Sequence, residues 1–195
     1  LYMLKNMTNV PMLVGDIVHG EIESVVKRLR HDAVVKSESS IESVIKSFRR
    51  RWKESKNKEW VKEPKRKTNL FEHYFDELPS NEKLLKVKDL LTSSINGFFN
   101  SDSYGFITRL APREWLSIEV LESFVHDGVK VWIKLDFSAR HADRIYIYDW
   151  KTGKEVKENE LQLAVYALYA MEKWGIDLQY IRLFDIYLSQ QIPVK

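Results

Sequence analysis

Residues 144–153 read Arg-Ile-Tyr-Ile-Tyr-Asp-Trp-Lys-Thr-Gly, an apolar run that ends in an acid and a base two positions apart. Successive side chains alternate across a strand, so Asp149 and Lys151 share one face. The residues before them are apolar on both faces, which predicts a strand buried on both sides. Because burying an unpaired charge is costly, we expect other polar groups to lie beside Asp149 and Lys151.

Two carboxylates and a lysine are sufficient to cut a phosphodiester bond. The carboxylates hold Mg²⁺ or Mn²⁺ through oxygen, the ion lowers the pKa of a bound water, and the lysine orients that water or neutralises developing charge. Asp136 is a candidate for the second carboxylate, and a histidine would add a nitrogen ligand that favours manganese-like ions. The alternative interpretation is a surface ion pair for Asp149 and Lys151, with His19 as a half-buried core residue.

The periodicity of the apolar residues predicts the elements that carry these side chains. Helical spacing predicts helices over residues 11–30, 40–61 with Ser40 as N-cap, 82–99 and 158–174 with Gly175 as stop. Alternation predicts strands over residues 115–125, 129–137, 144–151 and 180–188, with a loop over 100–112 and a turn at 126–128. The short spacing of the first three strands predicts an antiparallel meander. The helical crossover to the last strand predicts a parallel pair in a mixed sheet.

The meander leaves one problem for the proposed chemistry. Asp136 and Asp149 lie near the ends of two successive strands that run in opposite directions. Simple antiparallel pairing does not bring these two ends together, so a bend or bulge between the carboxylates is required.

Composition limits the class of protein and locates a basic region. The chain has 195 residues, 44% of them hydrophobic, which suits one domain with a real core. The absence of cysteine excludes disulfides, thiolate zinc sites and iron–sulfur clusters within these residues. No run of apolar residues is long enough for a membrane helix and no secretory leader is visible, so we expect a cytoplasmic protein without a membrane partner.

Positive charge is concentrated between Lys46 and Lys67. This range holds 11 basic and 3 acidic residues, a local charge of +8, which leaves 20 basic and 25 acidic residues elsewhere, or −5. Such a basic region beside an acidic body suits a polyanionic partner, and Arg49, Arg50 and Lys53 are our candidates for contacting nucleic acid. A solvated helix face followed by a linker is the alternative.

Taken in order, these motifs resemble the PD-(D/E)XK nuclease superfamily, and within it the RecB-like branch. The branch has a helix with Gly-x-x-x-His, a strand ending in Asp, a strand ending in Asp-x-Lys-Thr-Gly, and a helix with Gln-x-x-x-Tyr. Here the four motifs are read at Gly15–His19, Ile133–Asp136, Asp149–Gly153 and Gln162–Tyr166. The resemblance implies an α/β fold with a restriction-endonuclease-like core, in which helices flank a mixed central sheet. It also implies a single domain over residues 1–195, with a basic helical lobe inserted at about residues 38–112.

The resemblance implies a role for each matched residue of the central motifs. His19, Asp136 and Asp149 would be metal ligands, helped by the backbone carbonyl of Trp150. Lys151 would be the catalytic lysine, acting with the two aspartates.

Further roles follow for residues around this centre. Gln162 and Tyr166 would position either the DNA strand or Lys151. Either Glu119 or Glu122 would stand for the acidic residue that some members carry on a preceding strand. The sequence leaves the choice between these two glutamates open.

The function implied is that of a divalent-metal-dependent deoxyribonuclease, exonuclease-like, that uses Mg²⁺ or Mn²⁺ in DNA repair, recombination or defence. Its partners would be single- or double-stranded DNA and a helicase or other repair or defence protein. The main alternative is a noncatalytic DNA-binding or assembly module on the same fold, which would bind DNA without metal and lose little when Lys151 becomes alanine. An RNA-processing enzyme is a third alternative. Because cysteine is absent, the cluster-bearing architecture of some RecB-like nucleases is not expected.

Overall fold

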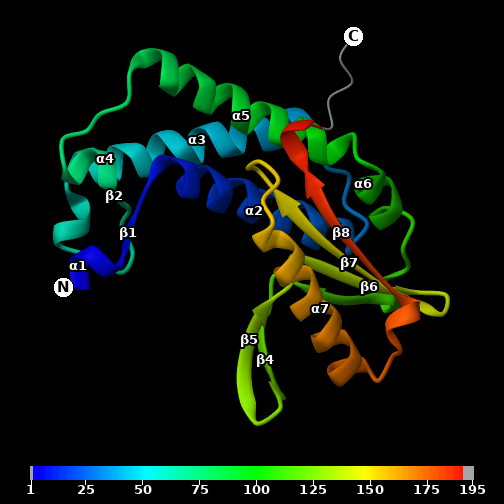
Figure 1. Ribbon diagram of the computed structural model, residues 1–195. Helices are drawn as coiled ribbons and strands as arrows, with labels where there is room; N and C mark the ends of the chain where they lie inside the picture. The colour runs from blue at the N-terminus through cyan, green and yellow to red at the C-terminus, as the bar shows by residue number, and fades with distance from the viewer. Residues whose placement is uncertain (1, 191–195) are drawn as a thin grey trace.

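The structure is a computed structural model and describes residues 2–190 (Figure 1). The helical segments are α1 (Tyr2–Lys5), α2 (Val10–Leu29), α3 (Ser37–Lys56), η1 (Glu59–Val61), α4 (Phe71–Tyr74), α5 (Asn81–Phe99), α6 (Asp102–Ile107), η2 (Pro112–Glu114), α7 (Glu158–Trp174), η3 (Leu178–Tyr180) and η4 (Leu188–Gln190). The strands are β1 (Met7–Thr8), β2 (Asn69–Leu70), β3 (Trp115–Ile118), β4 (Leu121–His126), β5 (Val129–Lys134), β6 (Phe137–His141), β7 (Arg144–Lys151) and β8 (Ile181–Tyr187).

The central sheet has four strands in the order β3-β6-β7-β8. β6 pairs antiparallel with both β3 and β7, whereas β8 pairs parallel with β7 after the α7 crossover. The predicted mixed sheet with a parallel last pair is therefore confirmed. β4 and β5 form a separate hairpin that extends away from the long helices (Figure 1).

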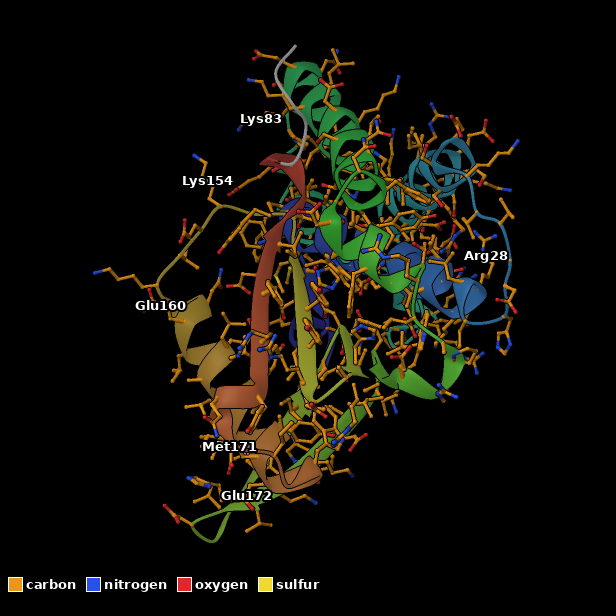
Figure 2. All side chains as sticks on the ribbon, turned by 90° about the vertical axis from the view of Figure 1, so that its right-hand side faces the viewer. Arg28, Lys83, Lys154, Glu160, Met171 and Glu172 are labelled. Carbon is orange, nitrogen blue, oxygen red and sulfur yellow. The ribbon has the colours of Figure 1, made fainter. Side chains whose placement is uncertain are left out.

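Helices cover both faces of this sheet (Figure 2). On one side of β7, Ile145 and Ile147 pack in one apolar cluster with residues of α7. On the other side, Tyr148 and Trp150 join a larger cluster with residues of α2, α3 and α5. The prediction that β7 is buried on both faces is confirmed, because Ile145, Ile147 and Trp150 are each at most 1% exposed. The residues that surround Asp149 and Lys151 at the end of β7 must therefore compensate for the free energy that burying these charges costs.

Local sequence signals account for the helices that position the site. At the start of α2, the Asn9 side chain accepts a hydrogen bond of 2.9 Å from the Met12 amide, and Pro11 occupies the first turn. α7 ends at Gly175, which adopts a left-handed conformation with φ of 58° and donates its N–H to Met171. Both helices follow their predicted ranges closely.

The second predicted helix differs from the observed one at both ends. α3 begins at Ser37, and Lys36 occupies the N-cap position, so the assignment of Ser40 as N-cap was wrong. Ser40 is buried inside the helix instead. At the other end, the left-handed backbone of Lys58, with φ of 55°, separates α3 from the short helix η1. The predicted loop at residues 100–112 also contains α6, which Ser101 caps by accepting from the Tyr104 amide.

Two predicted strands were too long, and each divides into two. The range 115–125 forms β3 and β4, and the range 129–137 forms β5 and the start of β6. The division occurs at Glu119, which has a left-handed backbone with φ of 54° and donates its N–H to the carbonyls of Leu135 and Asp136. The simple three-strand meander was therefore wrong, because both strands of the first hairpin bend at the same level. β3 and β6 stay in the central sheet, and β4 and β5 leave it.

Helices α3 to α6 occupy the range of the predicted lobe, and α3 and α5 contribute to the same apolar cluster as α2 and β7. One domain with an inserted lobe stays a prediction. Within residues 2–190, none of the helices combines the length and the apolarity that crossing a bilayer requires.

Candidate active site

The bend before β6 brings the two predicted aspartates together. Asp136 immediately precedes Phe137, the first residue of β6, which pairs with Tyr148 of β7. Asp136 therefore stands at the start of a strand rather than at its end, beside the terminal residues of antiparallel β7. Its Oδ2 atom accepts a hydrogen bond of 2.8 Å from the backbone amide of Trp150. Asp136 and Asp149 are 6% and 2% exposed, so both carboxylates are buried where the strand ends.

α2 and the bend add two further ligand groups. His19 projects from α2 so that its Nδ1 atom lies 3.3 Å from Oδ1 of Asp136 and 3.5 Å from Oε1 of Glu119. Each of these three residues offers a ligand atom, and the three atoms lie within 4.8 Å of one another. Gly15, one turn before His19, faces Thr152 just after β7, where an added Cβ would lie 3.5 Å from the threonine hydroxyl oxygen. The absence of a side chain at Gly15 therefore allows α2 to lie close to the end of β7.

The structure distinguishes between the two glutamates that the sequence left open. Glu119 lies in the group with His19 and Asp136, and its carboxylate also contacts Lys134. Glu122 points elsewhere, accepting a hydrogen bond of 2.7 Å from the Tyr169 hydroxyl. The left-handed backbone at Glu119 separates the two positions, because the chain turns there between β3 and β4. Alternation along one straight strand could not reveal this difference.

Lys151 and α7 complete the centre on the other side of Asp149. The Lys151 Nζ atom lies 2.5 Å from Oδ2 of Asp149 and donates a hydrogen bond of 2.5 Å to Oε1 of Gln162. Gln162 and Tyr166 both donate to Oδ1 of Asp149, at 3.2 and 2.8 Å. Tyr166 is only 4% exposed. Its burial favours the positioning role over contact with a DNA strand.

Burial and mutual charge set the electrostatics of the centre. Burial alone would lower the pKa of His19, but hydrogen bonds and charge from Asp136 and Glu119 outweigh it and raise the pKa from 6.5 to about 10. The pKa of Asp136 is raised, chiefly by burial, and the charge of Asp149 adds to the increase. The carboxylates of this site therefore stabilise a positive charge placed beside them.

The sequence model of the PD-(D/E)XK nuclease superfamily matches residues 5–191. The chain belongs to this superfamily. No curated protein and no solved structure gives a match. The mixed four-stranded sheet with flanking helices is consistent with the restriction-endonuclease-like fold that superfamily membership implies. Members of the superfamily are generally nucleases that use divalent metal ions.

The donor set fits a divalent ion of the kind that PD-(D/E)XK nucleases use. Four carboxylates, those of Glu119, Asp136, Asp149 and Asp185, and two lysines leave a formal charge of −2 when His19 is neutral, which is the form in which an imidazole binds a metal ion. Oxygen ligands with one imidazole suit Mg²⁺ and Mn²⁺. The buried Oδ1 of Asp185 also has no hydrogen-bond partner among the described residues, as expected where an ion or its water can bind. A divalent ion would balance the charge that the protein leaves uncompensated.

Asp185 and Lys134 were missed in the sequence. In β8, Asp185 pairs with Asp149, and burial together with the charge of Asp149 raises its pKa. The available signal was an acid in the otherwise apolar run 183–186. Lys134 and Asp136 alternate onto one face of the predicted strand, which was the signal for Lys134.

The predicted nucleic-acid contacts on α3 diverge from one another. Arg50 lines a polar cavity between α2 and α3, where it pairs with Glu54 at 2.9 Å. Arg49 lines a separate apolar hollow between α3 and α5, and Lys53 is exposed on α3. Contact of these residues with DNA stays a prediction, as does metal binding by the Trp150 carbonyl.

Proposed function

We propose that this protein is a divalent-metal-dependent deoxyribonuclease of the RecB-like branch, exonuclease-like in action, which serves DNA repair, recombination or defence. The observation that carries the proposal is the convergence of His19, Asp136, Asp149 and Lys151 at the end of β7. These groups come from α2, the bend before β6, and β7 itself. A structural ion pair would not need a histidine and two buried aspartates from three separate elements.

Each side chain has a task that its contacts support. His19 and Asp136 face the ion-binding position together with Asp149, and a divalent ion bound there would supply Lewis-acid activation of the phosphate and of a water. Asp136 is fixed by the Trp150 amide, which leaves its Oδ1 atom directed at His19. Glu119 also contacts the Nδ1 atom of His19, at 3.5 Å. These contacts hold the ligand atoms in place before an ion arrives.

Lys151 acts on the phosphate rather than on the ion in this proposal. Its ammonium is held between Asp149 and Gln162, at 2.5 Å from each, so it enters the reaction with its orientation already fixed. From there it orients the attacking water and neutralises charge that develops on the phosphate oxygens. Gln162 and Tyr166 are positioning residues, because their side chains hold Lys151 and Asp149.

Cleavage of end-labelled DNA in the presence of Mn²⁺ or Mg²⁺ tests the proposal, with single- and double-stranded substrates and an RNA of the same sequence in parallel. We expect metal-dependent cleavage of DNA that is lost in Asp149→Ala and in Lys151→Ala. Lys154→Ala is the matched control, because this exposed lysine three residues later points into solvent (Figure 2). It should cleave like the wild-type protein.

The alternatives give different results in the same assay. Cleavage no greater than that of Asp149→Ala would contradict the enzyme proposal and leave the noncatalytic module. Such a module would bind DNA in EDTA, and Lys151→Ala would bind as well as the wild-type protein. Preferential cleavage of the RNA would mean that RNA, and not DNA, is the substrate.

A further inference from the structure

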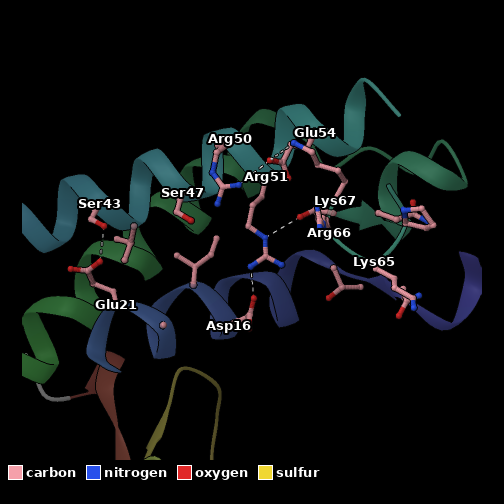
Figure 3. Close-up of a pocket in the computed structure, with 18 residues that line it drawn as sticks. Asp16, Glu21, Ser43, Ser47, Arg50, Arg51, Glu54, Lys65, Arg66 and Lys67 are labelled. Atoms are coloured by element: carbon pink, nitrogen blue, oxygen red, sulfur yellow. Dashed lines mark hydrogen bonds and ion pairs between the residues drawn. The ribbon is translucent and has the colours of Figure 1, made fainter. Parts of the chain in front are cut away.

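A second polar hollow lies between α2 and α3 (Figure 3). Its volume is about 650 Å³. α2 contributes Asp16 and Gly20, α3 contributes Ser47 and Arg51, and the segment before β2 supplies further basic and polar residues. These residues come from three separate parts of the chain, so the folded protein builds this hollow from elements that the sequence separates. We call it the α2–α3 cavity.

Positive charge exceeds negative charge in the α2–α3 cavity. Five cationic residues line it, against three acidic ones, which leaves a formal charge of +2; the cations are Arg50, Arg51, Lys65, Arg66 and Lys67. Glu54 is buried between Arg50 and Lys67, at 2.9 and 3.4 Å, and holds these two cations in place. Arg51 contacts Asp16 and also donates a hydrogen bond of 3.0 Å to the Thr68 hydroxyl. Each guanidinium carries five N–H donors, so these contacts leave donors available to an anion.

Two polar side chains in the cavity have no partner among residues 2–190. Asn69 is 3% exposed, yet neither its carboxamide nitrogen nor its oxygen makes a hydrogen bond there. Leaving both ends of a buried amide unpaired costs free energy, so a ligand that pairs with it binds at an advantage. Ser47 also lines the cavity, and no hydrogen bond of its hydroxyl is found within the same range. Donors from Asn69, Ser47 and the arginines suit the several acceptor oxygens of a phosphate.

Gly20 leaves the cavity open and links it to the active site. A Cβ added at Gly20 would meet nothing within 4 Å, and Gly20 directly follows His19 on α2. Successive helical residues point about 100° apart, so the metal site and the cavity lie on neighbouring sides of one helix, whose full diameter is about 10–12 Å. A nucleic-acid strand that reaches the metal site can therefore place a neighbouring phosphate in the cavity.

We propose that the α2–α3 cavity binds a phosphate group of the DNA strand near the bond that is cut. The proposal rests on the proposed function for the identity of the strand. Nucleic-acid contact is thereby assigned to one defined site and not to a diffuse basic face. In this site Arg50, Arg51 and Lys67 supply positive charge, and Asn69 supplies an amide donor. The same chemistry would suit either a terminal phosphate or an internal phosphodiester, and the test separates them.

The test compares Gly20→Glu with its neutral counterpart Gly20→Gln. Both side chains have room, and both replace a helical glycine with a better helix former, so neither is expected to unfold the protein. Affinity for a short fluorescent single-stranded oligonucleotide is measured in EDTA, where the metal site takes no part. The glutamate places a negative charge beside the phosphate, so Gly20→Glu should bind about ten-fold more weakly than Gly20→Gln. The slope of the logarithm of its affinity against the logarithm of the salt concentration should also become smaller in magnitude by about 0.7.

Asn69→Leu gives a second, independent readout. It replaces an unpaired buried amide with an apolar group of similar size, so the stability of the free protein should hold or rise. Its affinity for the oligonucleotide should fall, and inorganic phosphate should compete with the oligonucleotide less effectively than in the wild-type protein. Loss of stability without loss of affinity would contradict the assignment, because it would mean that the amide is satisfied by the protein itself.

Oligonucleotides with and without a 5′ or 3′ phosphate identify the group that binds. A Gly20→Glu defect confined to one phosphorylated end assigns the cavity to a terminal phosphate, and an equal defect with all of them assigns it to an internal phosphodiester. Equal affinity of Gly20→Glu and Gly20→Gln for every oligonucleotide would overturn the proposal. Because binding is measured without metal, that result leaves the nuclease proposal standing, and absence of cleavage leaves the phosphate site standing.

Discussion

The Tyr166 hydroxyl links the buried carboxylate of Asp149 to Gln162, and removing this hydroxyl tests how the centre is held. In Tyr166→Phe, Asp149 loses a donor at 2.8 Å and Gln162 loses an acceptor at 2.6 Å. Tyr166 is buried, and a hydrogen bond to a charged group contributes about 1.5–3 kcal/mol, so we expect the free energy of unfolding to fall by about 2 kcal/mol. For a chain of this size, that corresponds to a fall in Tm of about 4–8 °C.

The same change should slow the reaction. Asp149 keeps Lys151 and Gln162 as neighbours but loses the bond that fixes its Oδ1 atom, and loss of a partner behind a metal ligand typically costs about 10–100-fold. Thermal unfolding and Mn²⁺-dependent cleavage, measured on the same preparation, give both quantities. Adding Mn²⁺ in excess distinguishes weakened ion binding from a slower chemical step.

Tyr169→Phe is the matched control for this change. Tyr169 lies one turn further along α7 and is also buried, and its hydroxyl also donates to a carboxylate, that of Glu122, at 2.7 Å. Glu122 lies away from the metal site and has Lys173 as a second partner at 2.9 Å. Tyr169→Phe should lose stability of about 1 kcal/mol and cleave at the wild-type rate. Equal cleavage by both variants, or an equal loss in both, would refute the positioning role of Tyr166.

Three further predictions concern packing and metal binding. Gly97→Ala should lower the free energy of unfolding in urea by about 3 kcal/mol, because its added Cβ would lie 1.9 Å from a backbone carbonyl oxygen of η4; wild-type stability would contradict this packing. Gly20→Ala should raise the same quantity by about 0.8 kcal/mol, since its Cβ meets nothing within 4 Å, and a loss of stability would mean that the cavity is already filled. Mn²⁺ at about a hundred times its Kd should raise the stability of the wild-type protein by about 2.7 kcal/mol and that of Asp136→Asn by much less, as measured by thermal unfolding; equal shifts would place the ion elsewhere.

The sequence predicted those parts of the fold that local periodicity determines. The apolar run before Asp149 predicts a buried strand, and the stripe that carries Gln162 and Tyr166 predicts the helix that follows it. Both were confirmed, because alternation and helical spacing are properties of short segments. The parallel pairing of β8 followed from the length of the crossover.

The arrangement of the carboxylates in the site could not be predicted from local patterns, because it depends on residues that are distant in the sequence. The left-handed backbone at Glu119 divides two strands that alternation alone reads as continuous, and it places Asp136 at the start of β6. Glutamate has no special preference for this conformation, so its type gave no signal. Asp185 joins the centre only through its register with Asp149. The α2–α3 cavity depends on packing between α2, α3 and the segment before β2, which local patterns do not encode.

Anomalous diffraction from crystals soaked with Mn²⁺ would show whether Asp136 and Asp149 bind the same ion. We expect one ion that contacts both Asp136 and Asp149, with His19 as a nitrogen ligand and Lys151 still beside Gln162. An ion that contacts only one of the two aspartates, or no bound ion at the end of β7 at a concentration that supports cleavage, would contradict this expectation.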